Sequence, residues 1–189
     1  MNPGIRSFQL LHTPRLLLRE LREEDADSVY ELRSDEKVNE FIDRPRAVNV
    51  DDGLAFILLI KRNIVEKNVF YWAMELKEDM QMAGTICLWN FSEDRKAAEI
   101  GFELLPSFQG KGLASEALEA VLHFGFEQLE LQTVLAWFHR NNQASARLLS
   151  AKGFKQDQDE EEKNKGLEES KTMIIYSLHA PAFKRQHHS

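Results

Sequence analysis

Two kinds of hydrophobic pattern alternate along the chain. Runs of contiguous or alternating apolar residues predict strands, and apolar residues that repeat every three or four positions predict helices. Strands are predicted at residues 15–21, 69–76, 83–91, 97–105, 133–138 and 173–178, with a short one after Gly153. Helices are predicted at about residues 23–34, 51–67, 114–128 and 143–152. Trp72, Trp89 and Trp137 all fall in predicted strands, so we expect them in the core.

The three predicted strands between residues 69 and 105 are separated only by short polar segments, which is typical of an antiparallel meander. No linker rich in proline, glycine or serine and no internal repeat divides the 189 residues. We therefore expect one domain over residues 1–189, with its core at about 13–179. Residues 180–189 are expected to be a tail that ends in the disordered sequence His187-His188-Ser189.

The apolar runs are too short for a membrane protein. None approaches the roughly 18 consecutive apolar residues of a spanning helix, and Met1-Asn2-Pro3-Gly4 lacks the basic and apolar regions of a secretion signal. Cys87 is the only cysteine, so neither a disulfide nor a thiolate zinc cluster is expected. These features predict a cytoplasmic protein without a metal site or membrane contact, as a monomer or a homodimer.

The charge balance narrows the expected ligands. With 24 basic and 31 acidic residues the formal net charge is -7, which argues against nucleic-acid binding and favours a cationic substrate. Seven of the acids lie in one segment, residues 157–170, between the last two predicted strands. Such a segment is typical of a solvated loop; the alternative is that it attracts a cationic substrate.

One turn carries candidate chemistry. After the predicted strand 97–105 the chain reads Pro106-Ser107-Phe108-Gln109-Gly110-Lys111-Gly112-Leu113-Ala114 and continues with helical spacing. Glycines let a ligand approach the backbone, and the first N–H groups of a helix are unpaired donors at the positive end of its dipole. The turn can therefore bind phosphate. The alternative is an ordinary strand-to-helix turn that needs glycine for its dihedral angles.

The turn resembles the central signature of the GNAT acetyltransferases, Arg/Gln-x-x-Gly-x-Gly/Ala, which also follows a strand and a proline. Gln109, Gly110, Gly112 and Ala114 are in register with it. Downstream, Asn142-Gln143-Ala144-Ser145 and Gly153-Phe154 are similar to a helix and its ending in the same superfamily. Upstream, residues 13–19 and 98–102 resemble its Rim-type branch, the N-terminal acetyltransferases of ribosomal proteins.

The resemblance implies a fold, a cofactor and a set of site residues. The fold is α+β, with a mixed and mostly antiparallel central sheet of about six to seven strands flanked by about four helices. The cofactor is acetyl-CoA, which leaves as CoA. The implied contacts are the backbone of Gln109, Gly110, Lys111, Gly112, Leu113 and Ala114 for the pyrophosphate, Phe102, Leu104 and Leu105 for the pantetheine arm, and Asn142 and Ser145 for the thioester end. Asn142 is equally explained as a helix cap and Ser145 as a solvent-facing residue.

Acetylation of an amine requires a base that removes a proton from the ammonium. Glu99 is the leading candidate, because alternation along its strand places it on one face with the small residues Ala97 and Gly101. The alternative is a structural partner for a lysine or arginine on a neighbouring strand. His139 is a weaker candidate, and any of Glu160, Glu161 and Glu162 in the acidic segment is a further one.

The departing thiolate requires an acid. Many GNAT enzymes place a tyrosine on the helix after Asn142, and the spacing from Gly153 puts Leu149 at that position here. This departure leaves Ser145 as the candidate acid, with Tyr176 on the last strand as a more distant one.

The expected function is transfer of an acetyl group from acetyl-CoA to a primary amine, by direct attack in a ternary complex. The Rim-type resemblance favours a protein N-terminal amine as the acceptor. Two alternatives stay open: acetylation of a small amine such as a polyamine, an amino acid or an aminoglycoside, and acyl-CoA binding without catalysis, which only the missing tyrosine supports.

Overall fold

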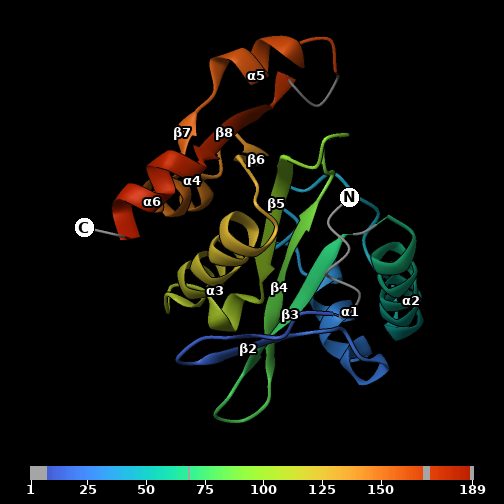
Figure 1. Ribbon diagram of the computed structural model, residues 1–189. Helices are drawn as coiled ribbons and strands as arrows, with labels where there is room; N and C mark the ends of the chain where they lie inside the picture. The colour runs from blue at the N-terminus through green and yellow to red at the C-terminus, as the bar shows by residue number, and fades with distance from the viewer. Residues whose placement is uncertain (1–7, 68, 168–170, 188–189) are drawn as a thin grey trace.

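Helices cover both faces of one twisted sheet. The protein was analysed as a computed structural model that describes residues 8–67, 69–167 and 171–187. In Figure 1, α1 and α2 lie to one side of the sheet, and α3, α4 and α6 lie to the other. The eight strands follow the order β1-β2-β3-β4-β5-β6-β8-β7. Glu168 and Glu169 of the acidic segment and residues 188–189 of the predicted tail lie outside the described residues.

The strands confirm the mixed, mostly antiparallel sheet. They are β1 (Leu11–His12), β2 (Leu16–Arg19), β3 (Phe70–Leu76), β4 (Met82–Trp89), β5 (Ala97–Leu104), β6 (Thr133–His139), β7 (Lys155–Gln156) and β8 (Met173–His179). The predicted meander is confirmed, because β3, β4 and β5 pair antiparallel in succession. Among the strands of the described residues only β5 and β6 pair parallel, and α3 lies between them in the chain. The expected number of strands was too low because β1 is only two residues long.

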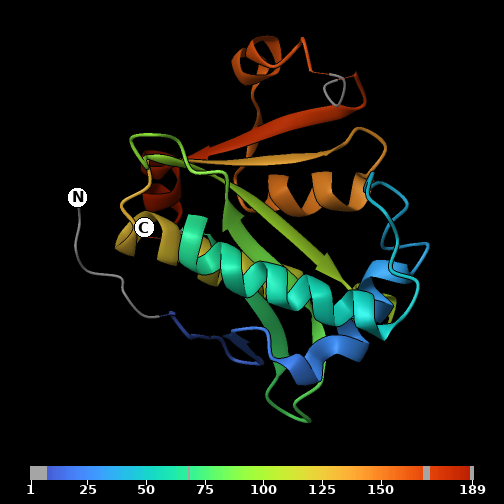
Figure 2. The same ribbon diagram turned by 90° about the vertical axis from the view of Figure 1, so that its right-hand side faces the viewer.

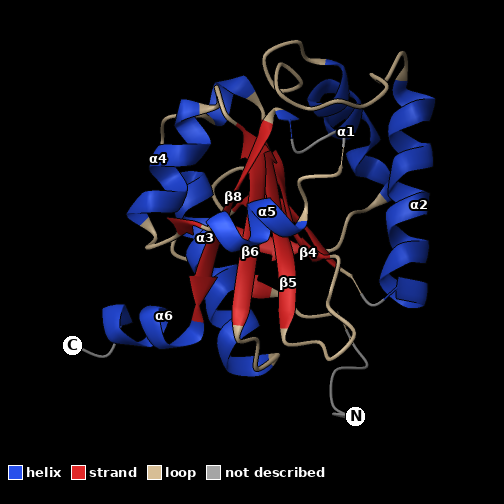
Figure 3. Ribbon diagram, turned by 90° about the horizontal axis from the view of Figure 1, so that it is seen from above, coloured by secondary structure: helices blue, strands red, loops and turns tan. Residues whose placement is uncertain are grey.

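The described residues form six α-helices, two more than predicted. They are α1 (Ala26–Ser34), α2 (Val50–Lys67), α3 (Leu113–His123), α4 (Gln143–Ala151), α5 (Gln158–Lys163) and α6 (Ala180–His187). Helix α3 continues into a π-helical turn at Phe124–Gln128. Figure 2 shows α2 lying lengthwise across one face of the sheet, and Figure 3 shows helices on both sides when the sheet is seen from above.

Both additional helices correct predictions. The acidic segment was predicted as a loop, but Asp157 caps α5 by accepting a hydrogen bond from the Glu160 N–H at 3.0 Å. Residues 180–189 were predicted as a tail, but residues 180–187 form α6, which docks through Phe183; this side chain is buried and lies 4.9 Å from the Phe126 ring, centroid to centroid. The prediction for Trp89 is also wrong, since 47% of its side chain is exposed.

Alternation along the strands separates two packing surfaces. The face toward α3, here called the α3 face, carries Ala98, Ile100 and Leu104 of β5 and belongs to the larger core cluster. The opposite face, here called the α2 face, carries Glu99 and Glu103 and is covered in part by α1 and α2. Charged side chains of β5 therefore lie on the α2 face alone.

A buried ion network fixes α1 to the sheet. Arg19, at the end of β2, donates two hydrogen bonds to the Asp25 carboxylate at 2.7 and 2.8 Å and one to Glu75 at 2.5 Å. Asp25 also accepts a hydrogen bond from the Arg22 N–H at 2.7 Å, which shapes the turn into α1. Because all three charges are buried, each depends on the others for compensation.

Replacing Arg19 by leucine is expected to lower the free energy of unfolding by about 3–5 kcal/mol, since two buried carboxylates lose their counter-charge. Arg22→Leu is the control, because Arg22 is 59% exposed and lies 3.8 Å from Glu75. It should cost less than about 1 kcal/mol. Equal losses in urea unfolding of the two variants would show that the network contributes no more than a surface ion pair.

Candidate active site

The two central strands of the sheet separate after a short pairing. β5 and β6 pair only at Ala97↔Thr133, Ala98↔Val134 and Glu99↔Leu135, although β5 continues to Leu104 and β6 to His139. Beyond Glu99 the inner edges of both strands therefore lack the sheet partner that central strands normally have. We call the gap between these diverging edges the wedge, and Glu99 lies at its apex.

The direction of the backbone groups along β5 shows what borders the wedge. The Leu105 N–H bonds the Ala83 carbonyl of β4 at 3.0 Å, whereas the Lys96 carbonyl accepts from the Gln132 N–H at 2.7 Å on the opposite edge. Because alternate residues of a strand point their N–H and C=O groups to opposite edges, Phe102 and Leu104 turn theirs toward the wedge. An extended amide-bearing ligand is the natural partner for such an edge.

The glycine turn, residues 106–114, lies directly after this edge. Gly110 and Gly112 have φ values of 73° and 77°, in the left-handed region that favours glycine. Helix α3 begins at Leu113, and its N-terminus has no side-chain cap. The Gln109 side chain donates to the Leu104 carbonyl at 2.9 Å and so fastens the turn to the end of β5. The turn therefore needs glycine for its dihedral angles. Because no side chain caps α3, the first N–H groups of the helix also remain open to an anion.

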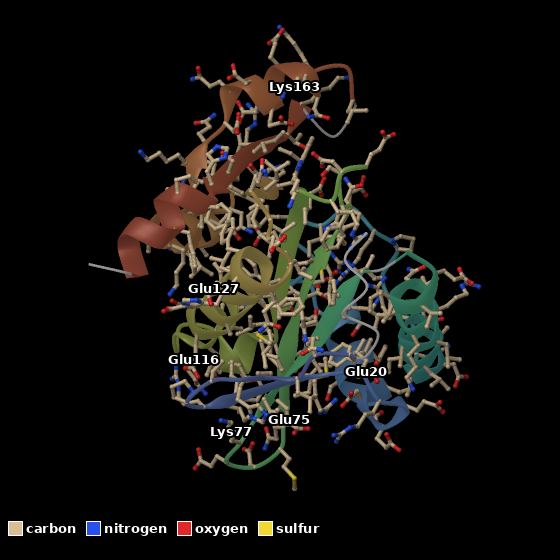
Figure 4. All side chains as sticks on the ribbon, in the orientation of Figure 1. Glu20, Glu75, Lys77, Glu116, Glu127 and Lys163 are labelled. Carbon is tan, nitrogen blue, oxygen red and sulfur yellow. The ribbon has the colours of Figure 1, made fainter. Side chains whose placement is uncertain are left out.

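Residues that precede β2 hold the first turn of α3 in place. The Glu116 carboxylate accepts hydrogen bonds from the Thr13 hydroxyl at 2.5 Å and from the Arg15 N–H and Nε, both at 2.7 Å. Arg15 also donates to the Lys111 carbonyl at 2.9 Å, within the turn itself. Figure 4 shows Glu116 on α3 next to the ribbon of the N-terminal strands. The sequence analysis missed this role, although the resemblance over residues 13–19 pointed to the segment.

These hydrogen bonds change the acidity of Glu116. Burial alone raises its pKa, but the bonds from Thr13 and Arg15 outweigh burial and hold the pKa below its ordinary value. Glu116 is therefore ionised at neutral pH and offers Arg15 a permanent counter-charge.

Helix α4 begins shortly after the end of β6, at the open end of the wedge. Asn142 caps it by accepting a hydrogen bond from the Ser145 N–H at 3.0 Å, which confirms the structural explanation for Asn142. Within the described residues the Ser145 hydroxyl has no hydrogen-bond partner. Leu149, at the position where the family resemblance places a tyrosine, is buried in the core, and its side chain has no acidic proton to donate. Tyr176 packs edge-on against Phe138 with ring centroids 4.9 Å apart.

Glu99 and Glu103 share the α2 face but differ in their partners. Glu99 Oε1 accepts a hydrogen bond from the Asn90 side-chain amide at 2.6 Å. Glu103 forms an ion pair with Arg44 at 2.7 Å and is therefore committed to a structural contact. Glu99 thus combines a position at the wedge apex with a neutral hydrogen-bond donor.

The segment between α1 and α2, residues 35–49, bridges the two diverging strands on the α2 face. Arg44 binds Glu103 of β5, and Phe41 stacks on His139 of β6 with ring centroids 5.2 Å apart. Glu103 and His139 each lie four positions beyond the last paired residues, Glu99 and Leu135, and so at the same level of the wedge. His139 also accepts a hydrogen bond from the Asn141 N–H at 3.2 Å, which favours its structural role.

The acidic helix α5 borders the α2 face on the far side. Glu160 pairs with Lys163 at 2.6 Å and Glu162 with Lys165 at 3.2 Å. Glu161 instead turns to the sheet, where it accepts from the Ile175 N–H at 3.0 Å. A cavity of about 410 Å³ lies between this helix and the sheet, with Glu161 and Glu162 in its lining.

Cys87 is unsuited to act as a nucleophile. It lies on the α2 face opposite Gly101 of β5, and burial raises the pKa of its thiol to about 12, with the charges of Glu103 and Glu99 acting in the same direction. Because the thiolate is not formed at neutral pH, this cysteine cannot carry an acyl group between donor and acceptor.

The family of the chain follows from its sequence and agrees with this geometry. Residues 15–155 match the acetyltransferase (GNAT) domain, so the chain belongs to the GNAT acetyltransferases. It is 32% identical over 146 residues to the uncharacterised N-acetyltransferase YnaD of Bacillus subtilis (strain 168), which covers 77% of this chain and 82% of YnaD. It is 29% identical over 150 residues to the uncharacterised N-acetyltransferase YoaA of the same organism, covering 79% and 85%.

The fold agrees with solved structures of the family. RimL, a ribosomal L7/L12 alpha-N-protein acetyltransferase in complex with coenzyme A, matches 92% of this chain and 99% of its own with a TM-score of 0.76 and 19% identity. Identity this low shows likeness of fold. The protein is thus an N-acetyltransferase that uses acetyl-CoA. Within the described residues no helix has both the length and the apolar character needed to cross a membrane.

A glutamate at position 110 is expected to weaken CoA binding by at least about 100-fold, because its carboxylate meets the pyrophosphate at the turn. A Cβ at Gly110 has no heavy atom within 4 Å, so no atom blocks the side chain, but the φ of 73° strains any non-glycine residue; Gly110→Ala carries that strain without the charge and is the control for it. Gly166→Glu is the control, since position 166 is equally open. Unchanged CoA affinity of Gly110→Glu in calorimetry would refute this placement of the pyrophosphate.

Glu116→Gln is expected to lower the free energy of unfolding by about 1–3 kcal/mol at pH 7. Because the folded-state pKa of Glu116 is lowered, its stabilisation is present above the unfolded value of about 4.3 and is lost as the pH falls through the folded value. Wild type and variant should therefore converge in acid. A stability difference that persists below about pH 3 would contradict this account.

Proposed function

We propose that this acetyltransferase acts on the N-terminal α-amine of a protein or peptide, by direct transfer in a ternary complex, with residues 1–189 as a single catalytic domain. The observation that carries the proposal is the wedge, which is bordered from the α3 face by the phosphate-binding turn and α4, and from the α2 face by Glu99 and the 35–49 bridge. Donor and acceptor then meet through the sheet from opposite faces.

The donor contacts follow the path from the turn to the apex. The backbone N–H groups from Gln109 to Ala114 bind the pyrophosphate, with Lys111 adding a positive charge at the exposed turn. Phe102 offers its backbone N–H and C=O to the amides of the pantetheine arm, and Leu104 offers its N–H, because its carbonyl already accepts from Gln109. Leu105 contributes only its side chain, because its N–H is already bonded to Ala83. Asn142 shapes the start of α4 rather than touching the thioester.

Acetyl-CoA supplies the acetyl group as an activated thioester. Glu99 removes a proton from the acceptor ammonium, so that the nitrogen lone pair can form the new C–N bond as the C–S bond breaks. Backbone N–H groups at the wedge edge stabilise the negative charge that develops on the carbonyl oxygen. Ser145, at the start of α4, delivers a proton to the departing sulfur, and its oxygen regains a proton from solvent as the acetylated nitrogen releases its second proton to form the neutral amide.

Several features support a polypeptide acceptor. RimL, which shares the fold, is by name an alpha-N-protein acetyltransferase. The net charge of -7 and the acidic helix α5 favour approach of a cationic N-terminus. A cytoplasmic location, consistent with the single cysteine, belongs to the same proposal.

A panel assay tests the proposal. The protein is incubated with acetyl-CoA and either peptides with free N-termini, polyamines, amino acids or aminoglycosides, and free thiol is followed. Peptides are expected to give the highest kcat/KM. Turnover confined to the small amines would contradict the polypeptide acceptor, and CoA binding without turnover on any acceptor would contradict catalysis.

Glu99→Gln is expected to lower kcat/KM by about 10²–10⁴-fold and to flatten its rise with pH between about pH 6 and 9, because the variant cannot accept the proton. Glu78→Gln, in the exposed turn between β3 and β4, is the control for loss of a carboxylate. If Glu99→Gln keeps the wild-type rate and pH profile, Glu161 becomes the carboxylate to examine, since of the three candidate glutamates in α5 it is the one that bonds the sheet.

A further inference from the structure

Trp137 carries a buried hydrogen-bond donor that no group in the described part of the protein satisfies. Its Nε1 is buried and has no acceptor among the described residues. Trp72 shows the usual arrangement, since its Nε1 donates to the Gln9 carbonyl at 2.7 Å. A buried N–H without an acceptor costs free energy, so its persistence calls for a ligand that supplies one.

Trp137 also lines the cavity of about 410 Å³ between α5 and the sheet. The floor of this cavity is apolar, with Met173 and Ile175 of β8, and its rim carries both charges, with Arg140 and Lys165 opposite Glu161 and Glu162. An apolar floor with a mixed rim suits a small neutral or zwitterionic group rather than a phosphate. The cavity and the unsatisfied donor therefore point to one occupant, a polar organic group with an acceptor oxygen.

The position of Trp137 relates this occupant to the acceptor amine. Trp137 lies on β6 two positions beyond Leu135, the partner of Glu99, and its side chain points to the same α2 face. Trp137 therefore lies about 7 Å further along the sheet than the level of Glu99, where the acceptor amine is proposed to bind. The carbonyl oxygens of the first two residues of a peptide lie within about that distance of its α-amine. The phosphate-binding turn precedes α3, whose helix packs on the other face, so CoA is not the expected occupant.

We propose that the Trp137 indole N–H donates a hydrogen bond to a backbone carbonyl of the acceptor, within its first two residues. The inference rests on the proposed function and makes it more specific, because it selects acceptors that carry a carbonyl close to the amine over simple alkylamines. In the proposed complex the indole turns from its buried position in the free protein so that Nε1 reaches the bound chain, and Ile175 and Met173 of the cavity lie next to the first side chain.

Trp137→Phe tests the proposal, because it removes the N–H and keeps an aromatic ring. The probes are a tetrapeptide amide with a free N-terminus and hexylamine, which lacks a carbonyl. Binding to the CoA-loaded protein is measured by calorimetry, and turnover by thiol release from acetyl-CoA. We expect about a five- to tenfold loss of peptide affinity and of peptide kcat/KM, with hexylamine and CoA unaffected.

Trp72→Phe is the matched control. It removes an indole N–H that the protein itself satisfies, so it should lower the melting temperature without changing the preference for the peptide over hexylamine. A loss for peptide and hexylamine alike, or for neither, in Trp137→Phe would overturn the proposal. A loss of CoA affinity would overturn it as well, because the indole N–H would then bind CoA rather than the acceptor.

A measurement on the wild-type protein covers the case in which Trp137→Phe does not fold. In protein labelled with ¹⁵N-tryptophan, the Trp137 indole resonance should shift downfield on addition of the peptide and stay in place with hexylamine. If the peptide produces no specific shift of this resonance, the proposal is overturned. A fixed internal water bonded to Nε1 would give that result. If the peptide is acetylated but the resonance does not shift, the proposed function stands and the role of Trp137 is rejected. If the peptide binds with the shift but is not acetylated, the role of Trp137 in binding stands and the proposed function is rejected.

Discussion

The separation of β5 and β6 is the constraint on which the rest of the site depends. In the middle of a sheet, backbone N–H and C=O groups are normally paired, because leaving them buried and unpaired is costly. Here the pairing ends at Glu99 and Leu135, and Phe102 and Leu104 point their backbone groups into the gap. An edge that suits an amide chain is thus created inside the sheet, with the glycine turn and the uncapped N-terminus of α3 at its end.

The same short N-terminal segment supports both sides of this gap. Thr13 and Arg15 hold the first turn of α3 through Glu116, and Arg19, four residues further along, holds the start of α1 through Asp25 and Glu75. One strand thereby fixes the donor turn against the α3 face and the helix that leads to the 35–49 bridge on the α2 face.

Local patterns were sufficient to predict much of the fold, including the glycine turn on which the proposed donor site is built. The meander, the glycine turn and the capping role of Asn142 depend on residues close together in the sequence, so periodicity and turn chemistry revealed them. The position of Glu99 on the face opposite Ile100 followed from alternation alone. Its place at the apex of the wedge did not, because that depends on where pairing with β6 ends.

The acceptor half depends on contacts between distant residues. Arg44 meets Glu103 and Phe41 meets His139 only after the sheet has assembled, and neither pair has a signature in the sequence. Helix α5 was predicted as a loop because its run of acids masks an ordinary cap at Asp157. Helix α6 was predicted as a tail because a single aromatic residue, Phe183, determines its docking. The unsatisfied indole of Trp137 likewise appears only when the surrounding atoms are placed.

Backbone amide exchange measured residue by residue, with and without CoA, tests the wedge most directly. The account predicts that CoA slows exchange at Phe102 and Leu104 and at the turn from Gly110 to Ala114, while Leu105, already bonded to β4, changes little. Protection confined to the turn, with Phe102 and Leu104 exchanging as fast as in the free protein, would contradict the claim that the separated edge of β5 binds the pantetheine arm.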